Sequence, residues 1–200
     1  MLDITNTQTL LDKAQEQSNK TQDKQYKETI RLYYIARYFV SIFEAFGHKV
    51  PIQVWNEYRN AFDHFARHMT MSERDSNHIK KIESHIQRAV LDICKFLCLE
   101  YADFFKEEIA EHTDYLGLVD NGKFLTSIEN IFNNAQKIFT EAKQVDSSLG
   151  SNNEKDKQVV EYYCNAVFEY KKIHTMFTNT QTLLDKAQEQ SNKTQDKQYQ

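Results

Sequence analysis

A short stretch near the first third of the chain carries residue types that suit proton transfer next to a negatively charged group. Arg59, Asn60 and His64 lie within the string YRNAFDHF. Asn60 and His64 are four residues apart and therefore share one face of a helix. Arg59 lies about 140° around the helix axis from His64, but its long side chain can swing towards that face. Together the three residues can supply a proton carrier, a positive charge and a hydrogen bond.

A second set of such residues follows in the next helical stretch. His85, Arg88 and Asp92 stand at positions i, i+3 and i+7, which form one continuous face. If the two stretches form an antiparallel hairpin that turns in the polar string MSERDSN, Arg88 lies level with Arg59 and His85 lies near Phe62. Two imidazoles and two guanidinium groups at one level are costly to bury, which favours a functional site.

An ordinary structural explanation fits the same residues. Asp63 stands four residues after Arg59, and Asp92 stands four residues after Arg88. Ion pairs at these spacings are common on solvated helix faces. Structural ion pairing therefore remains an alternative to a functional site at this stage.

Metal and cofactor chemistry is less favoured by the pattern. His64 and His68 have the spacing of half a metal site, but Phe65 stands where zinc proteases place a glutamate. Cys94 and Cys98 lie in an apolar helical run, and with Cys164 they are typical of small core residues in a reducing compartment. The sequence has no glycine-rich phosphate loop. We expect neither a bound metal nor a cofactor.

Long helices are the elements that must position these residues. The chain has 200 residues but only four glycines and one proline, and no stretch shows sustained alternation typical of a strand. Apolar residues recur at helical spacing, which predicts an all-α antiparallel bundle of about five long helices. These helices are expected at about residues 24–46, 51–70, 77–112, 124–145 and 155–177.

The helix expected at 51–70 carries many large apolar residues. We predict that they form its buried stripe: Val54, Trp55, Tyr58, Ala61, Phe62, Phe65 and Met69. Gly47 is expected to end the preceding helix, because glycine is common just beyond a helix C-terminus.

Both ends of the chain carry the same sequence. The segment Thr5–Tyr26 recurs without change at Thr178–Tyr199. This arrangement predicts a terminal extension at 1–23, a helical domain at 24–177 and a second extension at 178–200. The segment is mostly polar, so we expect the second copy to be a helical extension with little role in the core. Association between the two matching ends is the alternative.

The overall charge excludes a general binder of polyanions. The formal net charge is −4, yet between Arg59 and Lys95 seven basic residues stand against five acidic ones, and four of the seven histidines lie there. The N-terminus lacks the basic start and apolar core of a signal peptide, and no stretch approaches the roughly 20 apolar residues of a membrane span. We predict a cytoplasmic protein without membrane association.

The strings YRNAFDHFARHM and HIKKIESHIQRAVLDICKF resemble the HEPN superfamily over about residues 24–105. The motif of that family is an arginine, four to six residues and a histidine, which Arg59 and His64 match. The resemblance implies a small all-helical domain that dimerises and brings two such motifs into one cleft. It assigns Arg59 and His64 to catalysis and Asn60 to support. Four neighbouring residues are possible auxiliaries: His85, Arg88, Asp63 and Asp92.

The resemblance implies a metal-independent endoribonuclease, typical of toxins and antiviral defence effectors. Its histidine would deprotonate a ribose 2′-OH, and a guanidinium would stabilise the charge on the phosphorus, leaving 2′,3′-cyclic phosphate ends. The alternative is a HEPN-like module without catalysis that binds RNA or a partner protein such as an antitoxin. A third possibility is a plain helical bundle that assembles through its terminal repeats.

Overall fold

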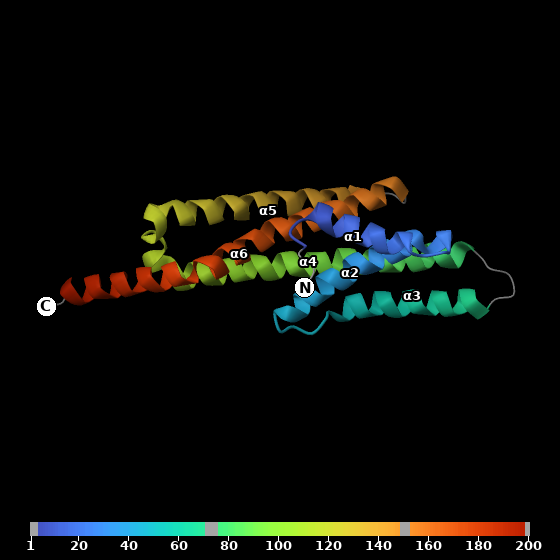
Figure 1. The fold of residues 1–200 in the computed structure, drawn as a ribbon, viewed down its shortest axis with the longest axis horizontal. Helices are drawn as coiled ribbons and strands as arrows, with labels where there is room; N and C mark the ends of the chain where they lie inside the picture. The colour runs from blue at the N-terminus through green and yellow to red at the C-terminus, as the bar shows by residue number, and fades with distance from the viewer. Residues whose placement is uncertain (1–3, 71–75, 149–152, 199–200) are drawn as a thin grey trace. The chain divides into compact units, whose positions relative to one another are not determined.

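The computed structural model describes residues 4–70, 76–148 and 153–198, and within these residues every regular element is helical. The predicted all-α class is therefore confirmed. The described residues form six α-helices rather than about five, together with two short 3₁₀ helices, η1 and η2. In chain order the elements are α1 (Thr7–Asn19), η1 (Lys24–Tyr26), α2 (Lys27–Ala45), α3 (Ile52–Thr70), α4 (Ser76–Leu116), η2 (Val119–Gly122), α5 (Lys123–Ser148) and α6 (Asn153–Gln198) (Figure 1).

The chain divides into two compact units. Unit 1 comprises residues 1–97 and 149–164, and unit 2 comprises residues 98–148 and 165–200. Helices α4 and α6 each contribute one part to either unit. The turns expected at 71–77 and 147–155 fall partly outside the described residues.

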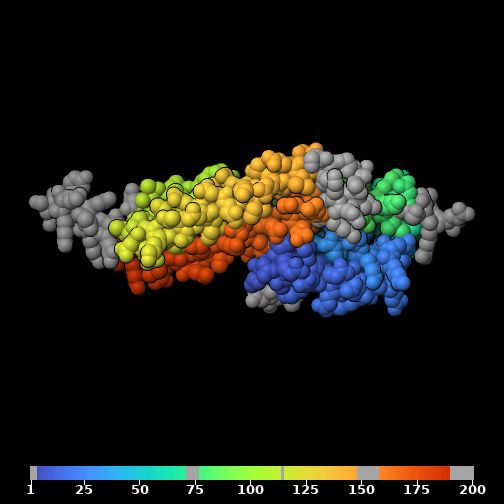
Figure 2. Space-filling view, turned by 90° about the horizontal axis from the view of Figure 1, so that it is seen from above, coloured from blue at the N-terminus to red at the C-terminus, as the bar shows by residue number. Residues whose placement is uncertain are grey.

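In unit 1 the N-terminal copy of the repeat forms a packed helix of its own. Asn6 caps α1 by accepting a hydrogen bond from the Thr9 amide at 2.9 Å. Leu10 and Ala14 are buried, and α1 lies side by side with α2 in both views (Figures 1 and 2). The Ser18 hydroxyl donates a hydrogen bond of 2.6 Å to the carbonyl of Lys27. The chain turns between α1 and α2, so this copy and the helix expected at 24–46 are separate elements.

Helix α2 ends next to Gly47, as the sequence predicts. Gly47 has a φ of +82°, and its amide donates a hydrogen bond of 2.9 Å to the carbonyl of Glu44. A residue with a side chain is strained in this left-handed conformation, so glycine is favoured immediately after the helix. The prediction that Gly47 ends this helix is confirmed.

Helix α3 buries only part of the predicted stripe. Val54, Ala61 and His68 are buried, at intervals of seven residues, and they define the side that faces the core of unit 1. The large apolar residues Trp55, Phe62, Phe65 and Met69 are exposed instead. The prediction is therefore confirmed for Val54 and Ala61 and wrong for the four exposed residues, because α3 carries apolar residues on two faces and only the one with the smaller residues packs.

Unit 2 contains residues 98–116 of α4, the whole of α5 and residues 165–198 of α6. Its core is aromatic: Phe105 stacks on Phe132 at 4.1 Å, and Phe124 meets Phe177 edge to face at 5.5 Å. Helix α5 lies beside α6 in both views (Figures 1 and 2). No helix within the described residues combines the length and apolar character needed to cross a membrane.

Helix α4 is longer than predicted at its C-terminal end. It continues to Leu116, because Tyr115 and Leu116 are buried and hold the last turn in place. The Tyr115 hydroxyl also donates a hydrogen bond of 2.6 Å to Nδ1 of His112. The expected loop is therefore reduced to the region around η2, where Asp120 and Asn121 adopt positive φ angles.

The C-terminal copy of the repeat continues α6 as a helix and packs in unit 2. Leu184 is 0% exposed and Ala187 is 6% exposed, whereas Leu183 is 54% exposed. The expectation that this copy has little role in the core is wrong for the turn that contains Leu184. A polar segment can still contribute to a core where two or three apolar residues fall on one face.

The adjacent residues Leu184 and Leu183 provide a matched test of this packing. We expect Leu184→Ala to lower the free energy of unfolding by about 2–5 kcal/mol, because it removes buried methyl groups and leaves a cavity. Leu183→Ala is expected to change it by less than about 0.5 kcal/mol, because the side chain is exposed. Urea titration measures both values. Equal effects for the two variants would contradict the packing of the C-terminal copy.

Candidate functional site

Helices α3 and α4 form an antiparallel hairpin in unit 1 (Figure 1). Nδ1 of His64 lies 3.1 Å from Nδ1 of His78, and Oε2 of Glu57 lies 2.6 Å from Nδ1 of His85. His64, which follows Glu57 in α3, thus contacts His78, which precedes His85 in α4. This order is the one that an antiparallel pair of helices requires. The hairpin predicted from the sequence is present, with His85 within about one helical turn of the expected level.

Three imidazole rings come together at this hairpin. The ring of His64 stacks on that of His85, with centroids 5.4 Å apart and an interplanar angle of 19°. It lies 5.3 Å from the ring of His78. We call His64, His78, His85 and Glu57 the imidazole cluster. One of the two facing Nδ1 atoms of His64 and His78 must carry a hydrogen and donate it to the other.

Glu57 fixes the orientation of His85. Its carboxylate accepts a hydrogen bond from Nδ1 of His85, and both side chains are mostly covered. This bond leaves Nε2 of His85 as the nitrogen that can exchange a proton with another molecule. Arg88 stands beside the pair, with Nη1 3.9 Å from the Glu57 carboxylate and Nη2 donating a hydrogen bond of 3.0 Å to the Ser84 hydroxyl.

The surroundings of His64 lower its pKa below the ordinary value. Partial burial is the largest cause, because it disfavours the charged imidazolium. Positive charge at His85, Lys81 and His78 lowers the pKa further, and the carboxylate of Asp63 opposes these effects. At neutral pH His64 is therefore held in the neutral form, which can accept a proton.

This shift predicts how stability depends on pH. The unfolded chain binds a proton at His64 more readily than the folded chain, so stability falls as the pH drops below about 6.5 and through the folded pKa. His64→Asn should reduce this loss of stability. Burial and the charge of Lys171 also lower the pKa of His174. His174 therefore adds to the loss of stability at low pH. Urea unfolding at several pH values measures the slope, and an unchanged slope in His64→Asn would contradict the assignment.

The structure separates Arg59 from His64. Arg59 is exposed on the side of α3 that faces away from α4, and no described residue forms an ion pair or hydrogen bond with its guanidinium group. Asp63, one of its candidate partners, instead forms an ion pair of 3.0 Å with Arg67. Asn60 lies half-buried between the two faces. Within one chain, therefore, the cluster contains the histidine of the predicted motif but not its arginine.

The other predicted auxiliary residues divide in the same way. His85 joins the cluster, and Arg88 lies at its edge through Glu57. Asp92 is half-buried on α4, seven residues beyond His85. Contacts thus bring His85 and Arg88 to the site, and the charge of Asp63 acts on His64.

Two members of the cluster were missed by the sequence interpretation. Glu57 stands seven residues before His64, and His78 stands seven residues before His85. A spacing of seven places both pairs on a common helix face. This spacing from His64 and His85 is the signal in the sequence that identifies Glu57 and His78.

Residues considered for metal binding have other surroundings. The ring of His68 is buried and lies edge to face with Tyr26, with centroids 6.1 Å apart. It belongs to the core-facing side of α3, so the pairing of His64 with His68 is not formed. Cys94, Cys98 and Cys164 are buried and free of disulfide bonds. Within the described parts of the chain, no group of three or more histidine, cysteine or acidic side chains is arranged to hold a metal ion.

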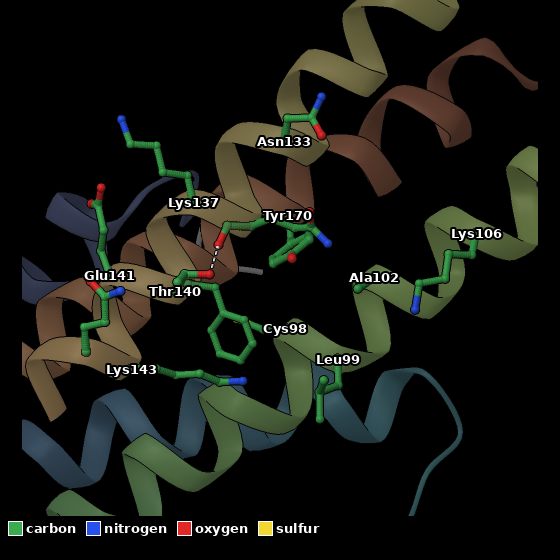
Figure 3. A pocket seen from close by; sticks show the side chains of 13 residues that line it. Cys98, Leu99, Ala102, Lys106, Asn133, Lys137, Thr140, Glu141, Lys143 and Tyr170 are labelled. Atoms are coloured by element: carbon green, nitrogen blue, oxygen red, sulfur yellow. Dashed lines mark hydrogen bonds between the residues drawn. The ribbon is translucent and has the colours of Figure 1, made fainter. Parts of the chain in front are cut away.

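A separate hollow of about 720 Å³ lies in unit 2 between α4, α5 and α6 (Figure 3). Lys106, Lys137 and Lys143 stand around it, together with Phe139 and Tyr170. The ammonium group of Lys143 lies over the Phe139 ring at 4.2 Å. The hollow has positive charge but no histidine in its lining, so it lacks the proton carrier that the imidazole cluster offers.

Comparisons of the chain with models of protein families, with curated proteins and with solved structures found no match.

Proposed function

We propose that this protein is a metal-independent endoribonuclease of the HEPN type that acts as a homodimer, in the role of a toxin or antiviral defence effector. The observation that carries the proposal is the stack of His64 on His85 at 5.4 Å, with the second ring oriented by Glu57. Two imidazoles in contact provide the two proton carriers that RNA cleavage without a metal requires.

The two histidines take different roles in the proposed reaction. Neutral His64 accepts the proton of a ribose 2′-OH, which then attacks the neighbouring phosphorus. The leaving 5′-oxygen takes a proton from protonated His85, whose Nδ1 is occupied by Glu57. The P–O5′ bond breaks, and the products are a 2′,3′-cyclic phosphate and a 5′-OH.

Positive charge beside the cluster suits a phosphate. Arg88 lies at its edge through Glu57, and the charge of Lys81 acts on His64. Both side chains are exposed and can turn towards a bound phosphodiester. A guanidinium group forms paired hydrogen bonds with phosphate oxygens, and its charge stabilises the transition state. Within one chain Arg88 is therefore better placed for this role than Arg59.

An exposed stripe on α3 supports the homodimer. Six residues recur at alternating intervals of three and four, as in the contact positions of a coiled coil, and all of them are exposed. Phe62 is 70% exposed and Trp55 is 55% exposed, which is unusual for a surface that remains in water. We call these residues the α3 stripe: Ile52, Trp55, Arg59, Phe62, Ala66 and Met69.

The α3 stripe is complementary to itself. When two copies pair antiparallel about a two-fold axis between Arg59 and Phe62, Trp55 of one copy meets the small Ala66 of the other. Arg59 then lies against Phe62 of the second copy, which is a favourable cation–π arrangement. Isologous contacts of this kind are the usual basis of homodimers. In this dimer Arg59 acts at the interface.

A second function is favoured by the separation of Arg59 from His64. If both residues of the HEPN motif are needed in one cleft, the chain is a non-catalytic module, and the α3 stripe is a surface for a partner protein or supports RNA binding. Such a module retains the imidazole cluster as a polar contact between α3 and α4.

Incubation of the purified protein with total RNA in EDTA distinguishes the two functions. The endoribonuclease produces fragments in EDTA, because no metal takes part in the reaction. A module that binds RNA shifts it in a gel and leaves it intact. Intact RNA under conditions where it is bound would overturn the catalytic proposal.

A further inference from the structure

The chain contains one sequence twice, but only one of the two copies occupies the docking position on α2. In the first copy, Thr5–Tyr26, residues 7–19 form α1 and pack against α2, whereas residues 178–198 of the identical second copy lie in α6. The side chains that hold α1 against α2 therefore occur a second time in each chain.

The docked copy uses one face of its helix. Thr7, Leu10, Ala14 and Ser18 are buried, and Leu10 is only 2% exposed. These residues recur at intervals of three or four, so they lie in one row along α1. Ser18 adds a specific contact through the hydrogen bond from its hydroxyl to the carbonyl of Lys27.

The same row is only partly covered in the C-terminal copy. Leu183, the counterpart of Leu10, is 54% exposed, although Leu10 is almost completely buried. Ala187, the counterpart of Ala14, is buried with Leu184 in unit 2. The C-terminal copy thus presents the main apolar residue of the docking face to solvent, while a neighbouring face holds it in unit 2.

We propose that the C-terminal copy of one chain takes the place of α1 on α2 of a second chain. The occupant is defined by sequence: a segment identical to α1 offers α2 the same leucine, alanine and serine at the same spacing. It also brings the same charges to the polar hollow of about 520 Å³ beside α1, which Asp12, Glu28 and Arg31 line. No new side chain has to be accommodated.

Tethering decides when this exchange occurs. Helix α1 is joined to α2 by a short turn, so its effective concentration at the docking position is high. Exchange also requires the helical turns around Ala187 to lose their packing contacts in unit 2. The exchanged form therefore accumulates when α1 is displaced from α2, and it then links chains in the manner of a domain swap.

Placing the same substitution in either copy tests this proposal in the full chain. Leu10→Asp puts a charge on the docking face of α1, and we expect it to raise the sedimentation coefficient above that of the wild type in a concentration-dependent way. Leu183→Asp alone should leave the wild-type value unchanged. In the double variant both docking faces are blocked, and the extra association should disappear.

Two outcomes would overturn the proposal. Extra association that is as strong in the double variant as in Leu10→Asp would mean that the C-terminal copy is not the occupant. No extra association in Leu10→Asp, with amides of residues 7–19 exchanging rapidly, would mean that the vacant position is not filled by a second chain.

A peptide measurement covers the case in which Leu10→Asp fails to fold. A labelled peptide of residues 178–200 is expected to bind the wild-type chain weakly and the Leu10→Ala variant at least about tenfold more tightly, because tethered α1 then competes less well. The same peptide with Leu183→Asp should not bind. Equal binding of the two peptides would contradict docking through this face.

Discussion

Replacing His64 with alanine is expected to reduce RNA cleavage by at least about a hundredfold, the low end for a group that transfers a proton in the rate-limiting step. The reason is that neutral His64 is the proposed acceptor of the 2′-OH proton, and its ring lies against the second proton carrier, His85. The variant should lose no more than about 1–2 kcal/mol of stability, because His64 is only half-buried. Initial rates on a defined RNA, at folding matched by circular dichroism, measure the effect.

His48→Ala is the matched control for this prediction. His48 is exposed and lies against Phe43, outside the imidazole cluster. Its replacement should leave the rate within about twofold of the wild type, since it has no part in proton transfer. Equal cleavage by wild type, His64→Ala and His48→Ala would exclude the imidazole cluster as the site of cleavage.

Replacing Phe62 with aspartate is expected to convert the dimer into a monomer at tens of micromolar protein. Phe62 is the most exposed large apolar residue of the α3 stripe, and in the proposed dimer it lies against Arg59 of the second copy. Burying a carboxylate among apolar residues of an interface is strongly unfavourable, so dissociation should rise by at least about a hundredfold. Sedimentation velocity measures the change.

Leu118→Asp is the control for the dimer prediction. Leu118 is also an exposed apolar residue, but it lies beside η2 in unit 2 and not on α3. It should leave the oligomeric state unchanged. A wild-type protein that is monomeric at tens of micromolar, or a dimer that survives Phe62→Asp, would show that the α3 stripe does not bind a second copy.

Helical periodicity predicted the class of fold and the pairing of α3 with α4. It did not predict which face of α3 is buried. Apolar residues occupy two faces of this helix, and the buried face is marked by Val54, Ala61 and His68, which are small or polar. The predicted stripe therefore combined Val54 and Ala61, which are buried, with Trp55 and Phe62, which are exposed, and it did not include His68.

The terminal repeat shows a different limit. One sequence is a capped, separate helix at the N-terminus and part of a continuous helix at the C-terminus. It buries Leu10 in the first copy and Leu184, the counterpart of Leu11, in the second. Tertiary contacts therefore select the face that packs, and local propensity cannot decide between the two arrangements.

The candidate site was partly predictable for a similar reason. His64 and His85 were found from their residue type and spacing, and the hairpin brings them together. Arg59 was grouped with His64 because they are close in sequence, yet about 140° of rotation places them on different sides of α3. Glu57 and His78, which complete the cluster, carry no motif of their own and were recognisable only from a spacing of seven residues.

The chemical ends of the cleaved RNA test the central claim most directly. Cleavage by the imidazole pair in EDTA should leave a 2′,3′-cyclic phosphate on one fragment and a 5′-OH on the other, because the attacking group is the ribose 2′-OH. An RNA with a single 2′-deoxy nucleotide at the cleaved position should remain intact. Fragments that carry 3′-OH and 5′-phosphate ends, or cleavage at the 2′-deoxy position, would contradict the proposed mechanism.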